Sequence, residues 1–303
     1  MIEALRLLYY NSAKVRAFSF IRRSFNMINR IILIVLIAAA VLFLLYLFCI
    51  APKLPGNRLP ARFKSFEYAH RGYHNIRRGI AENSMPAFRR AVSNGYAIEL
   101  DLHRTLDGQV VVFHDDNLRR ICGVDRPIWT CTYDELSSLR LQGTNERIPL
   151  FRDVLSFVNG QVPLLIELKL PSHDMTLCRE AWDILRNYKG PFMIQSFNTF
   201  GLRWFRKHAP FILRGQLSSD LTQERRNSIV QAAYLPCVLA KYLICNVIGR
   251  PDFISYRYSA RRNLSFWLDC NLFRAGAAVW TIRGEDLRRR LSVSYDMVIM
   301  EEE

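Results

Sequence analysis

"IELDLHRTLDGQVVVFHDD", residues 98–116, joins two apolar runs that each end in polar side chains. In the first run Glu99 and Asp101 are two residues apart, so on a strand their side chains lie on the same face. The second run closes with His114. Functional groups collect in this way at the carboxyl ends of parallel strands. The stretch therefore predicts a strand and, at its end, part of a functional site.

The same pattern recurs along the chain from residue 66 onward. Apolar, β-rich runs end abruptly in polar residues, and amphipathic segments follow several of them. The apolar runs are 66–72, 96–104, 110–116, 162–170, 191–197, 211–219, 252–258, 277–284 and 296–302. The helical candidates are 84–95, 132–141, 150–160, 177–188 and 199–208. Alternation of strand and helix is typical of a parallel sheet.

This alternation predicts a single TIM (β/α)8 barrel over residues 67–303. There are nine apolar runs, one more than the eight strands of such a barrel. We expect the final run or the run near Ile212 to lie outside the barrel. Asp107 and Gly108 can form a hairpin turn, which would send His114 to the wrong end of the barrel. A doubly wound open sheet is therefore the alternative fold.

Residues 31–50, "IILIVLIAAAVLFLLYLFCI", carry no charge. As a helix they would span the roughly 30 Å hydrocarbon core of a bilayer. A signal peptide has a shorter apolar core, closed by a small-residue cleavage site. We expect a retained transmembrane helix, preceded by a basic segment, 1–30, and followed by a proline-rich linker, 51–66. Met27, just before the apolar run, is a second candidate for the start of translation.

The chain has a formal net charge of +15 and seven cysteines. Its basic N-terminus favours an extracytoplasmic barrel in a single-pass membrane protein, whereas unpaired cysteines favour the opposite side, so the sidedness stays open. There is no nucleic-acid-binding motif, and the charge fits a membrane surface and an anionic phosphate substrate better than nucleic acid. Solubility explains the excess equally well. No CxxC pair points to structural zinc.

Three carboxylates suggest a cation site. Glu99 and Asp101 would repel each other at a strand end unless a cation lay between them, and Glu167, in "LIELKL", can supply a third oxygen ligand. Ligands that are all oxygens suit Mg²⁺ or Ca²⁺. Lys169 and Arg71 can bind a phosphate group. The alternatives are that one of the first two carboxylates faces solvent, and that Glu167 and Lys169 form a simple ion pair.

His70 and His114 each close an apolar run. Because histidine titrates near neutral pH, two of them on opposite sides of a substrate can act as general base and general acid. Each one taken singly is more often structural. Glu82 is not needed for helix capping, which Ser84 supplies, so it can orient a base or a metal-bound water. Trp280 can wall the site against a glycerol or lipid group, or simply pack in the barrel.

Taken in order, these motifs resemble the glycerophosphodiester phosphodiesterase family, in its membrane-anchored bacterial type. The resemblance implies a TIM barrel, a divalent cation, and hydrolysis of a glycerophosphodiester to glycerol 3-phosphate and an alcohol. Members of the family carry the same short TxDG link with the histidine still in the site. The matching motifs are "AHRG" (69–72), "ENS" (82–84), "IELDLHRTLDGQVVVFHDDNLRR" (98–120), "IELK" (166–169), "QSF" (195–197) and "WTIR" (280–283).

The resemblance also implies a role for each matching site residue. It makes two histidines, His70 and His114, the acid/base pair. It makes three carboxylates, Glu99, Asp101 and Glu167, the metal ligands. The phosphate contacts that it implies are Arg71 and Lys169.

Two segments depart from the family pattern. The usual closing "GIITDxP" is here "DMVIMEEE", so the polar contribution of the last strand is open. The segment between "QSF" and "WTIR" is unusually basic, which indicates either a membrane-facing surface or a different substrate lip. Two alternative functions therefore remain. One is lysophospholipase D-type hydrolysis of lysophospholipids at the membrane, and the other is non-catalytic phosphate binding by a membrane-tethered protein.

Overall fold

The computed structural model describes residues 1–54, 59–64, 66–171, 173–227 and 232–302. Of residues 3–13, 15, 17, 19 and 21 it describes only the backbone. The chain divides into two compact units, Met1–Phe48 and Cys49–Glu303. The second unit contains every strand of the structure and the predicted functional residues. Each unit is therefore described by itself.

The N-terminal unit is part of one continuous helix, α1 (Ile2–Ile50). Within it, Arg22–Ile50 is long and apolar enough to cross a membrane. Large apolar side chains in this part, among them Leu36, Leu42 and Phe48, are exposed. A helix with these properties near an N-terminus is typical of a membrane anchor or of a signal sequence.

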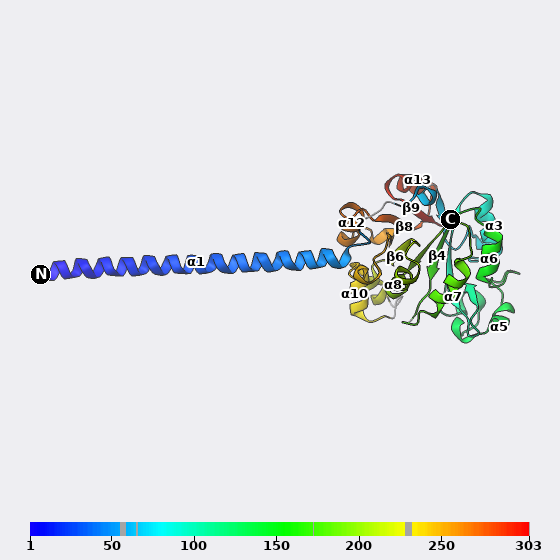
Figure 1. The fold of residues 1–303 in the computed structure, drawn as a ribbon, viewed down its shortest axis with the longest axis horizontal. Coiled ribbons are helices and arrows are strands. Elements are labelled where there is room, and N and C mark those ends of the chain that lie inside the picture. Colours follow the sequence, from blue (N-terminus) through cyan, green and yellow to red (C-terminus); the bar gives the residue numbers. More distant parts are fainter. Residues whose placement is uncertain (55–58, 65, 172, 228–231, 303) are drawn as a thin grey trace. The chain divides into compact units, whose positions relative to one another are not determined.

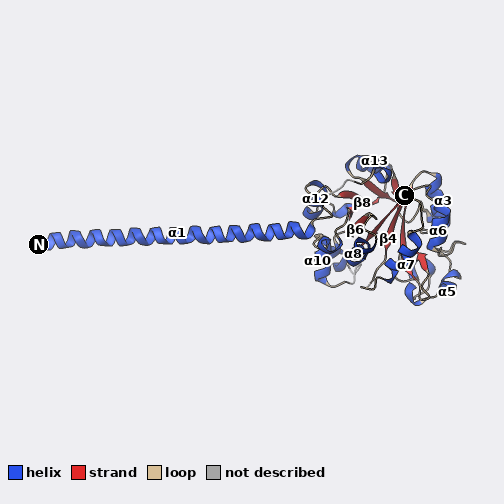
Figure 2. Ribbon diagram, viewed as in Figure 1, coloured by secondary structure: helices blue, strands red, loops and turns tan. Residues whose placement is uncertain are grey.

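Eight parallel strands form a closed barrel in the second unit, with helices around it (Figures 1 and 2). The pairing of β1 with β2 closes the ring, since β1 also pairs with β9. This confirms the predicted TIM barrel and excludes the open sheet. The strands are β1 (Glu67–Ala69), β2 (Ala97–Arg104), β4 (Leu164–Leu168), β5 (Phe192–Ser196), β6 (Arg214–Ser218), β7 (Phe253–Arg257), β8 (Gly276–Ile282) and β9 (Met297–Met300).

The strand outside the barrel is β3 (Val110–Val112), which pairs with β2 in antiparallel orientation. The expectation that the final run or the run near Ile212 would lie outside was wrong, because β9 and β6 are both barrel strands. The link between β2 and β3 is too short for a parallel crossover, which takes about a dozen residues or more. A hairpin is the only connection that this length allows.

The hairpin nevertheless leaves His114 near the barrel mouth. β2 is the longest barrel strand, and its pairing with β4 ends at Leu102, so its last residues extend beyond the rim. β3 therefore begins beyond the rim and runs back toward the barrel, so that its Val112 pairs with Leu102 of β2. Phe113 then donates its backbone N–H to the carbonyl of Asp101 at 3.0 Å. The hairpin therefore brings the chain back down to the level of Asp101, with His114 as the next residue.

Helices cover the outside of the barrel, and one of them overlaps each predicted helical segment. The first, α3, begins as predicted, because the Ser84 side chain accepts a hydrogen bond from the Ala87 N–H and Pro86 lies in the first turn. The helices are α3 (Met85–Ser93), α4 (Arg119–Cys122), α5 (Tyr133–Ser137), α6 (Phe151–Val158), α7 (Thr176–Leu185), α8 (Thr199–His208), α9 (Leu221–Arg226), α10 (Tyr234–Lys241), α11 (Asn246–Gly249), α12 (Leu264–Asn271) and α13 (Glu285–Ser294), with single 3₁₀ turns η1 (Ile76–Arg78), η2 (Ile128–Thr130) and η3 (Tyr258–Ala260).

Part of the predicted linker packs against the barrel. A short helix, α2 (Ala61–Lys64), precedes β1, and its Phe63 is buried together with Leu59. Both side chains join a cluster that contains inward-facing residues of several barrel strands. The Tyr68 hydroxyl donates to the Phe63 carbonyl at 2.9 Å. Leu59 and Phe63 are therefore part of the domain core, while 55–58 and 65 of the predicted linker lie outside the described residues.

Candidate active site

The predicted site residues converge on one end of the barrel, at the carboxyl ends of β1, β2 and β4. His70 and Arg71 directly follow β1, and the register of the sheet pairs Asp101 of β2 with Glu167 of β4. Glu99 lies one pleat earlier on β2, on the same face as Asp101. Parallel strands present their carboxyl ends at the same rim, which explains why residues distant in sequence meet here.

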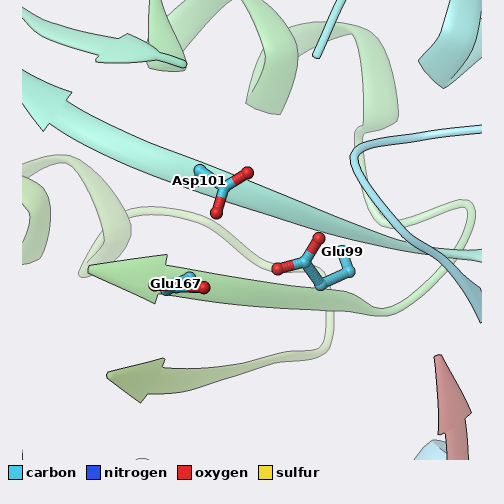
Figure 3. Close-up of side chains that lie close together, drawn as sticks. All are labelled: Glu99, Asp101 and Glu167. Carbon is cyan, nitrogen blue, oxygen red and sulfur yellow. The ribbon is translucent and has the colours of Figure 1, made fainter. Parts of the chain in front are cut away.

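Glu99, Asp101 and Glu167 form an acidic cluster (Figure 3). One carboxylate oxygen from each lies within 4.8 Å of the others, and all three side chains are buried. The Lys169 ammonium lies 3.0 Å from Asp101 Oδ1 and 2.6 Å from Glu167 Oε1. Buried carboxylates at this separation require positive charge between them, and Lys169 supplies one such charge.

The acids of this cluster titrate very differently. Burial, the charge of Asp101 and that of Glu167 raise the pKa of Glu99 well above its usual value. Burial also raises the pKa of Glu167 to about 7, although Lys169 opposes this. Burial acts on Asp101 as well, but Lys169 and the neighbouring cationic groups outweigh it and lower the pKa of that carboxyl. Full ionisation of all three acids therefore needs more positive charge than Lys169 alone supplies.

The donor set fits a hard divalent cation. Every candidate ligand atom is an oxygen, as Mg²⁺ and Ca²⁺ prefer. Asn83 donates its Nδ2–H to Asp101 at 2.9 Å and Gln195 donates to Glu99 at 3.3 Å. Their carbonyl oxygens, Asn83 Oδ1 and Gln195 Oε1, are buried and have no hydrogen-bond partner among the described residues. Unsatisfied buried acceptors beside an acidic cluster are a further sign that a cation fits there.

Arg71 reaches the cluster through an unusual backbone conformation. Its φ of 54° is in the left-handed region, which costs a residue with a side chain roughly 1–2 kcal/mol. Its N–H donates to Glu99 Oε2 at 3.0 Å, and its guanidinium donates to Glu82 Oε1 at 2.7 Å. Gly72 follows at φ 77°, where a Cβ would lie 2.9 Å from that of Ala87. The glycine is therefore needed both for its conformation and for its lack of a side chain.

Each of the two histidines has a carboxylate on its Nδ1. His70 Nδ1 lies 2.6 Å from Glu301 Oε1, and His114 Nδ1 lies 2.6 Å from Asp115 Oδ1. The histidines and neighbouring arginines lower the pKa of both carboxyls despite their partial burial, so these are acceptors and each imidazole donates from Nδ1. This arrangement leaves each Nε2 available for a substrate.

The surroundings also affect the charge of His114. Burial and the positive charge of Lys169 lower the pKa of its imidazole to about 4, against the opposing effect of Asp101. His114 is therefore neutral at neutral pH. Charge on either His70 or His114 in turn lowers the pKa of Asp101.

Glu82 and Arg120 connect the two sides of the site. Glu82 accepts from Arg71, and Arg120 donates two hydrogen bonds to Glu82 at 2.8 Å each. The same guanidinium donates to both carboxylate oxygens of Asp115, at 2.6 and 2.8 Å, and Asp115 is bonded to His114. Glu82 is thus a partner of arginines and lies outside the acidic cluster.

Five further residues contact the predicted site residues or their partners but were not predicted: Glu301, Asp115, Arg120, Asn83 and Gln195. Two of them obey the rule that polar residues end the apolar runs: Asp115 comes after His114, and Glu301 is in the polar end of the ninth run. The departure of the closing segment from the family pattern therefore does not leave the last strand without a polar contribution. Asn83, Arg120 and Gln195 lie in the matching motifs "ENS", "HDDNLRR" and "QSF", but the motifs alone did not assign them a role in the site.

Trp280 lies on β8 against other mouth residues. Its ring packs edge-on against Phe197 at 5.9 Å, and the Arg257 guanidinium lies over it at 5.0 Å. Its indole N–H donates to the Ser255 carbonyl at 3.1 Å. Arg257 in turn pairs with Glu224 of α9 at 2.7 Å. Trp280 is thus held by an aromatic ring, a guanidinium and a backbone carbonyl.

The model of the glycerophosphoryl diester phosphodiesterase family matches residues 70–265. This span includes most of the barrel and all of the acidic cluster, and the chain belongs to this family.

Several curated relatives match part of the chain. Rat Lysophospholipase D GDPD1 is 33% identical over 153 residues, which are 46% of this chain and 46% of that protein. The Glycerophosphodiester phosphodiesterase of Caldanaerobacter subterraneus subsp. tengcongensis is 28% identical over 166 residues, 51% of this chain and 67% of that protein. The chain thus spans about half the length of the rat relative that it matches.

Solved structures share the fold. A phosphodiesterase of Oleispira antarctica in complex with the product sn-glycerol-3-phosphate aligns with a TM-score of 0.61 and 24% identity, covering 78% of this chain and 92% of that one. A glycerophosphodiester phosphodiesterase of Thermotoga maritima gives 0.59 and 24% identity, covering 78% and 94%. The likeness confirms the barrel.

Proposed function

We propose that this protein hydrolyses glycerophosphodiesters to glycerol 3-phosphate and an alcohol. The single observation that carries the proposal is the meeting of two carboxylate-bound histidines with a buried acidic cluster at one rim of the barrel. Family membership points to the same chemistry. The names of the Caldanaerobacter relative and of the Oleispira complex indicate the substrate and product class.

Glu99, Asp101 and Glu167 would hold the divalent cation, Mg²⁺ or Ca²⁺. When bound, such an ion neutralises charge on the non-ester oxygens of the phosphate as the pentavalent state forms. Arg71 and Lys169 add fixed positive charge for the same group. Because Glu82 and Glu99 restrain Arg71, its guanidinium needs little reorganisation when the substrate binds.

The two histidines perform the proton transfers. His114 is neutral, and its Nδ1–H is bonded to Asp115, so Nε2 carries the free lone pair of a general base. It takes a proton from the nucleophile, either water or a neighbouring hydroxyl of the substrate. His70, oriented by Glu301, then protonates the departing alcohol. Trp280 and Phe197 exclude water from the leaving-group side.

A second candidate is lysophospholipase D-type hydrolysis of a lysophospholipid at the membrane. Two observations favour it: the name of the rat relative, and an N-terminal helix that is long and apolar enough to span a bilayer. We propose that this helix anchors a single-pass membrane protein. The reaction at phosphorus is the same for both substrate classes, so the catalytic residues have the same roles in each.

Both functions are tested on the full chain in detergent, with glycerophosphocholine and lysophosphatidylcholine assayed in parallel and with added Mg²⁺ or Ca²⁺. Release of glycerol 3-phosphate from the soluble diester supports the first function, and release of lysophosphatidic acid supports the second. Hydrolysis at background with either cation would contradict both and would favour a phosphate-binding protein without catalysis.

A further inference from the structure

The point where the apolar helix enters the barrel unit is fixed by side chains. Asn246 of α11 donates from Nδ2 to the carbonyl of Ile50 at 2.7 Å, and its side chain is buried. Arg250 donates to the carbonyl of Ala51 at 2.7 Å. The Lys53 N–H donates to the Pro251 carbonyl at 2.9 Å. Side chains and backbone of the barrel unit therefore bind the chain at residues 50–53, directly at the end of α1.

The elements around this entry point are connected to one another. Asn246 also donates to Asp269 of α12 at 2.9 Å. Asn263, the N-cap of α12, donates to the carbonyl of Lys241 at 3.2 Å, and Lys241 is the last residue of α10. Ile50, α10, α11 and α12 thus belong to one contiguous part of the barrel unit, and Figure 1 shows α10 and α12 at the same edge of it.

Large apolar side chains are exposed on this part of the surface. On α10 and α12, all of whose residues the structure describes, the only acidic residue is the buried Asp269. Arg262 and Arg274, on either side of α12, are exposed. We call the following set the α10–α12 face: Tyr234, Leu235, Tyr242, Leu264, Trp267 and Leu272, which are between 40% and 65% exposed.

We propose that the α10–α12 face rests on the surface of the bilayer that α1 spans. The inference depends on the proposal that α1 is a membrane anchor. The uncharged run 31–50 ends at Ile50, so this residue lies where the proposed anchor leaves the hydrocarbon core. The entry point must therefore lie at the lipid headgroups.

The chemistry of the face suits that position. Tryptophan and tyrosine concentrate at membrane interfaces, because their rings are apolar and their N–H or O–H groups remain hydrated. Arginines at this level meet lipid phosphate groups. A protein partner would more often bring complementary acidic residues to such a face. The short covalent link to the bilayer selects lipid as the occupant.

Trp267 provides the test. The full chain is reconstituted in vesicles of phosphatidylcholine and phosphatidylglycerol, with and without bromine on the upper part of the acyl chains, and tryptophan fluorescence quenching is measured. We expect the Trp267→Phe variant to lose most of the quenching seen in the wild type. Trp129→Phe is the matched control: Trp129 is 41% exposed but lies in η2, outside the α10–α12 face, and its replacement leaves the quenching unchanged.

Flotation of the same vesicles and hydrolysis of glycerophosphocholine separate the ways in which the proposals can fail. A chain that does not float with the vesicles overturns both the anchor and the face. A chain that floats, but whose quenching is the same with and without Trp267, overturns the face alone. Hydrolysis reports on the proposed activity independently of either result, and the circular dichroism spectrum of the Trp267 variant shows whether it is folded.

Discussion

His70 donates a hydrogen bond of 2.6 Å to Glu301, a residue 231 positions later in the chain. The two residues follow β1 and β9, which are neighbours only because the barrel closes. Glu301 also accepts from Arg283 at 2.6 Å, so its carboxylate is held from both sides. Closure of the barrel thus orients one of the two proposed catalytic histidines.

Glu301→Gln should lower the turnover number while leaving the fold intact. The amide keeps an acceptor for the Nδ1–H of His70 but removes the negative charge beside the ring. We expect the loss of a large part of the roughly 10²–10⁴-fold that acid–base catalysis contributes, measured as kcat on glycerophosphocholine. Glu302→Gln is the control, since it changes the same charge one residue away, where the partners are Arg90 and Arg78. Equal kcat values for the two variants would remove Glu301 from the mechanism.

Arg120→Ala should reduce activity far more than stability. Its guanidinium positions both Glu82 and Asp115, but its side chain is half exposed, so its ion pairs contribute only about 0–1 kcal/mol to folding. We expect kcat to fall by about tenfold or more, as for other residues that orient catalytic groups. Arg120→Lys should recover only part of this, because an ammonium lacks the planar fork. Arg119→Ala, which removes an exposed ion pair with Asp125, should leave kcat unchanged. A similar fall in kcat for this variant would show that the loss comes from disturbing α4 and not from Arg120 itself.

Much of this site was predictable because strand periodicity places residues two apart on one face. That rule placed Glu99 beside Asp101, and Glu167 beside Lys169, without knowledge of the fold. The position of His114 along the barrel axis, at the rim that carries the acids, was not predictable in this way. It depends on how far β2 extends beyond its pairing with β4, and a single sequence does not show where pairing stops.

Cation binding should release protons, and more of them in mild acid. Burial raises the pKa of Glu167 to about 7 and that of Glu99 well above its usual value, so the cation-free cluster is partly protonated at about pH 6. A cation binds the ionised form, so its affinity should rise as the pH increases through about 7. Isothermal titration with Ca²⁺ in two buffers of different ionisation enthalpy measures the protons released. Glu167→Gln should weaken binding and flatten this dependence; an affinity that fell with rising pH would contradict the assignment.

The buried ion pair at the base of the barrel should stabilise the domain. Arg214 is 1% exposed and lies 3.1 Å from Asp252. Asp252→Ala would leave a buried guanidinium without its carboxylate, at a cost of about 3–5 kcal/mol. Glu285→Ala, in the exposed pair with Arg289, should cost about 0–1 kcal/mol. Denaturant unfolding of the two variants in detergent measures the difference, and equal midpoints would show that the buried pair is dispensable.

Contacts between residues that are far apart in the chain could not be predicted from the sequence. Asn246 carries no motif, yet it fixes the carbonyl of Ile50 from almost two hundred residues away. Leu59 and Phe63 stand in a proline-rich segment typical of a linker, but the barrel interior leaves an apolar space at its base that they fill. Such pairings depend on how the elements pack, and local periodicity carries no information about them.

The most direct measurement is a crystal structure of the protein with Mn²⁺ and glycerol 3-phosphate, from which an anomalous difference map is calculated. Our account predicts one strong peak within about 2.0–2.6 Å of oxygens from Glu99, Asp101 and Glu167, with the phosphate beside it and an imidazole on each side. A map with no peak among these three carboxylates, or with the ion held elsewhere on the barrel, would contradict it.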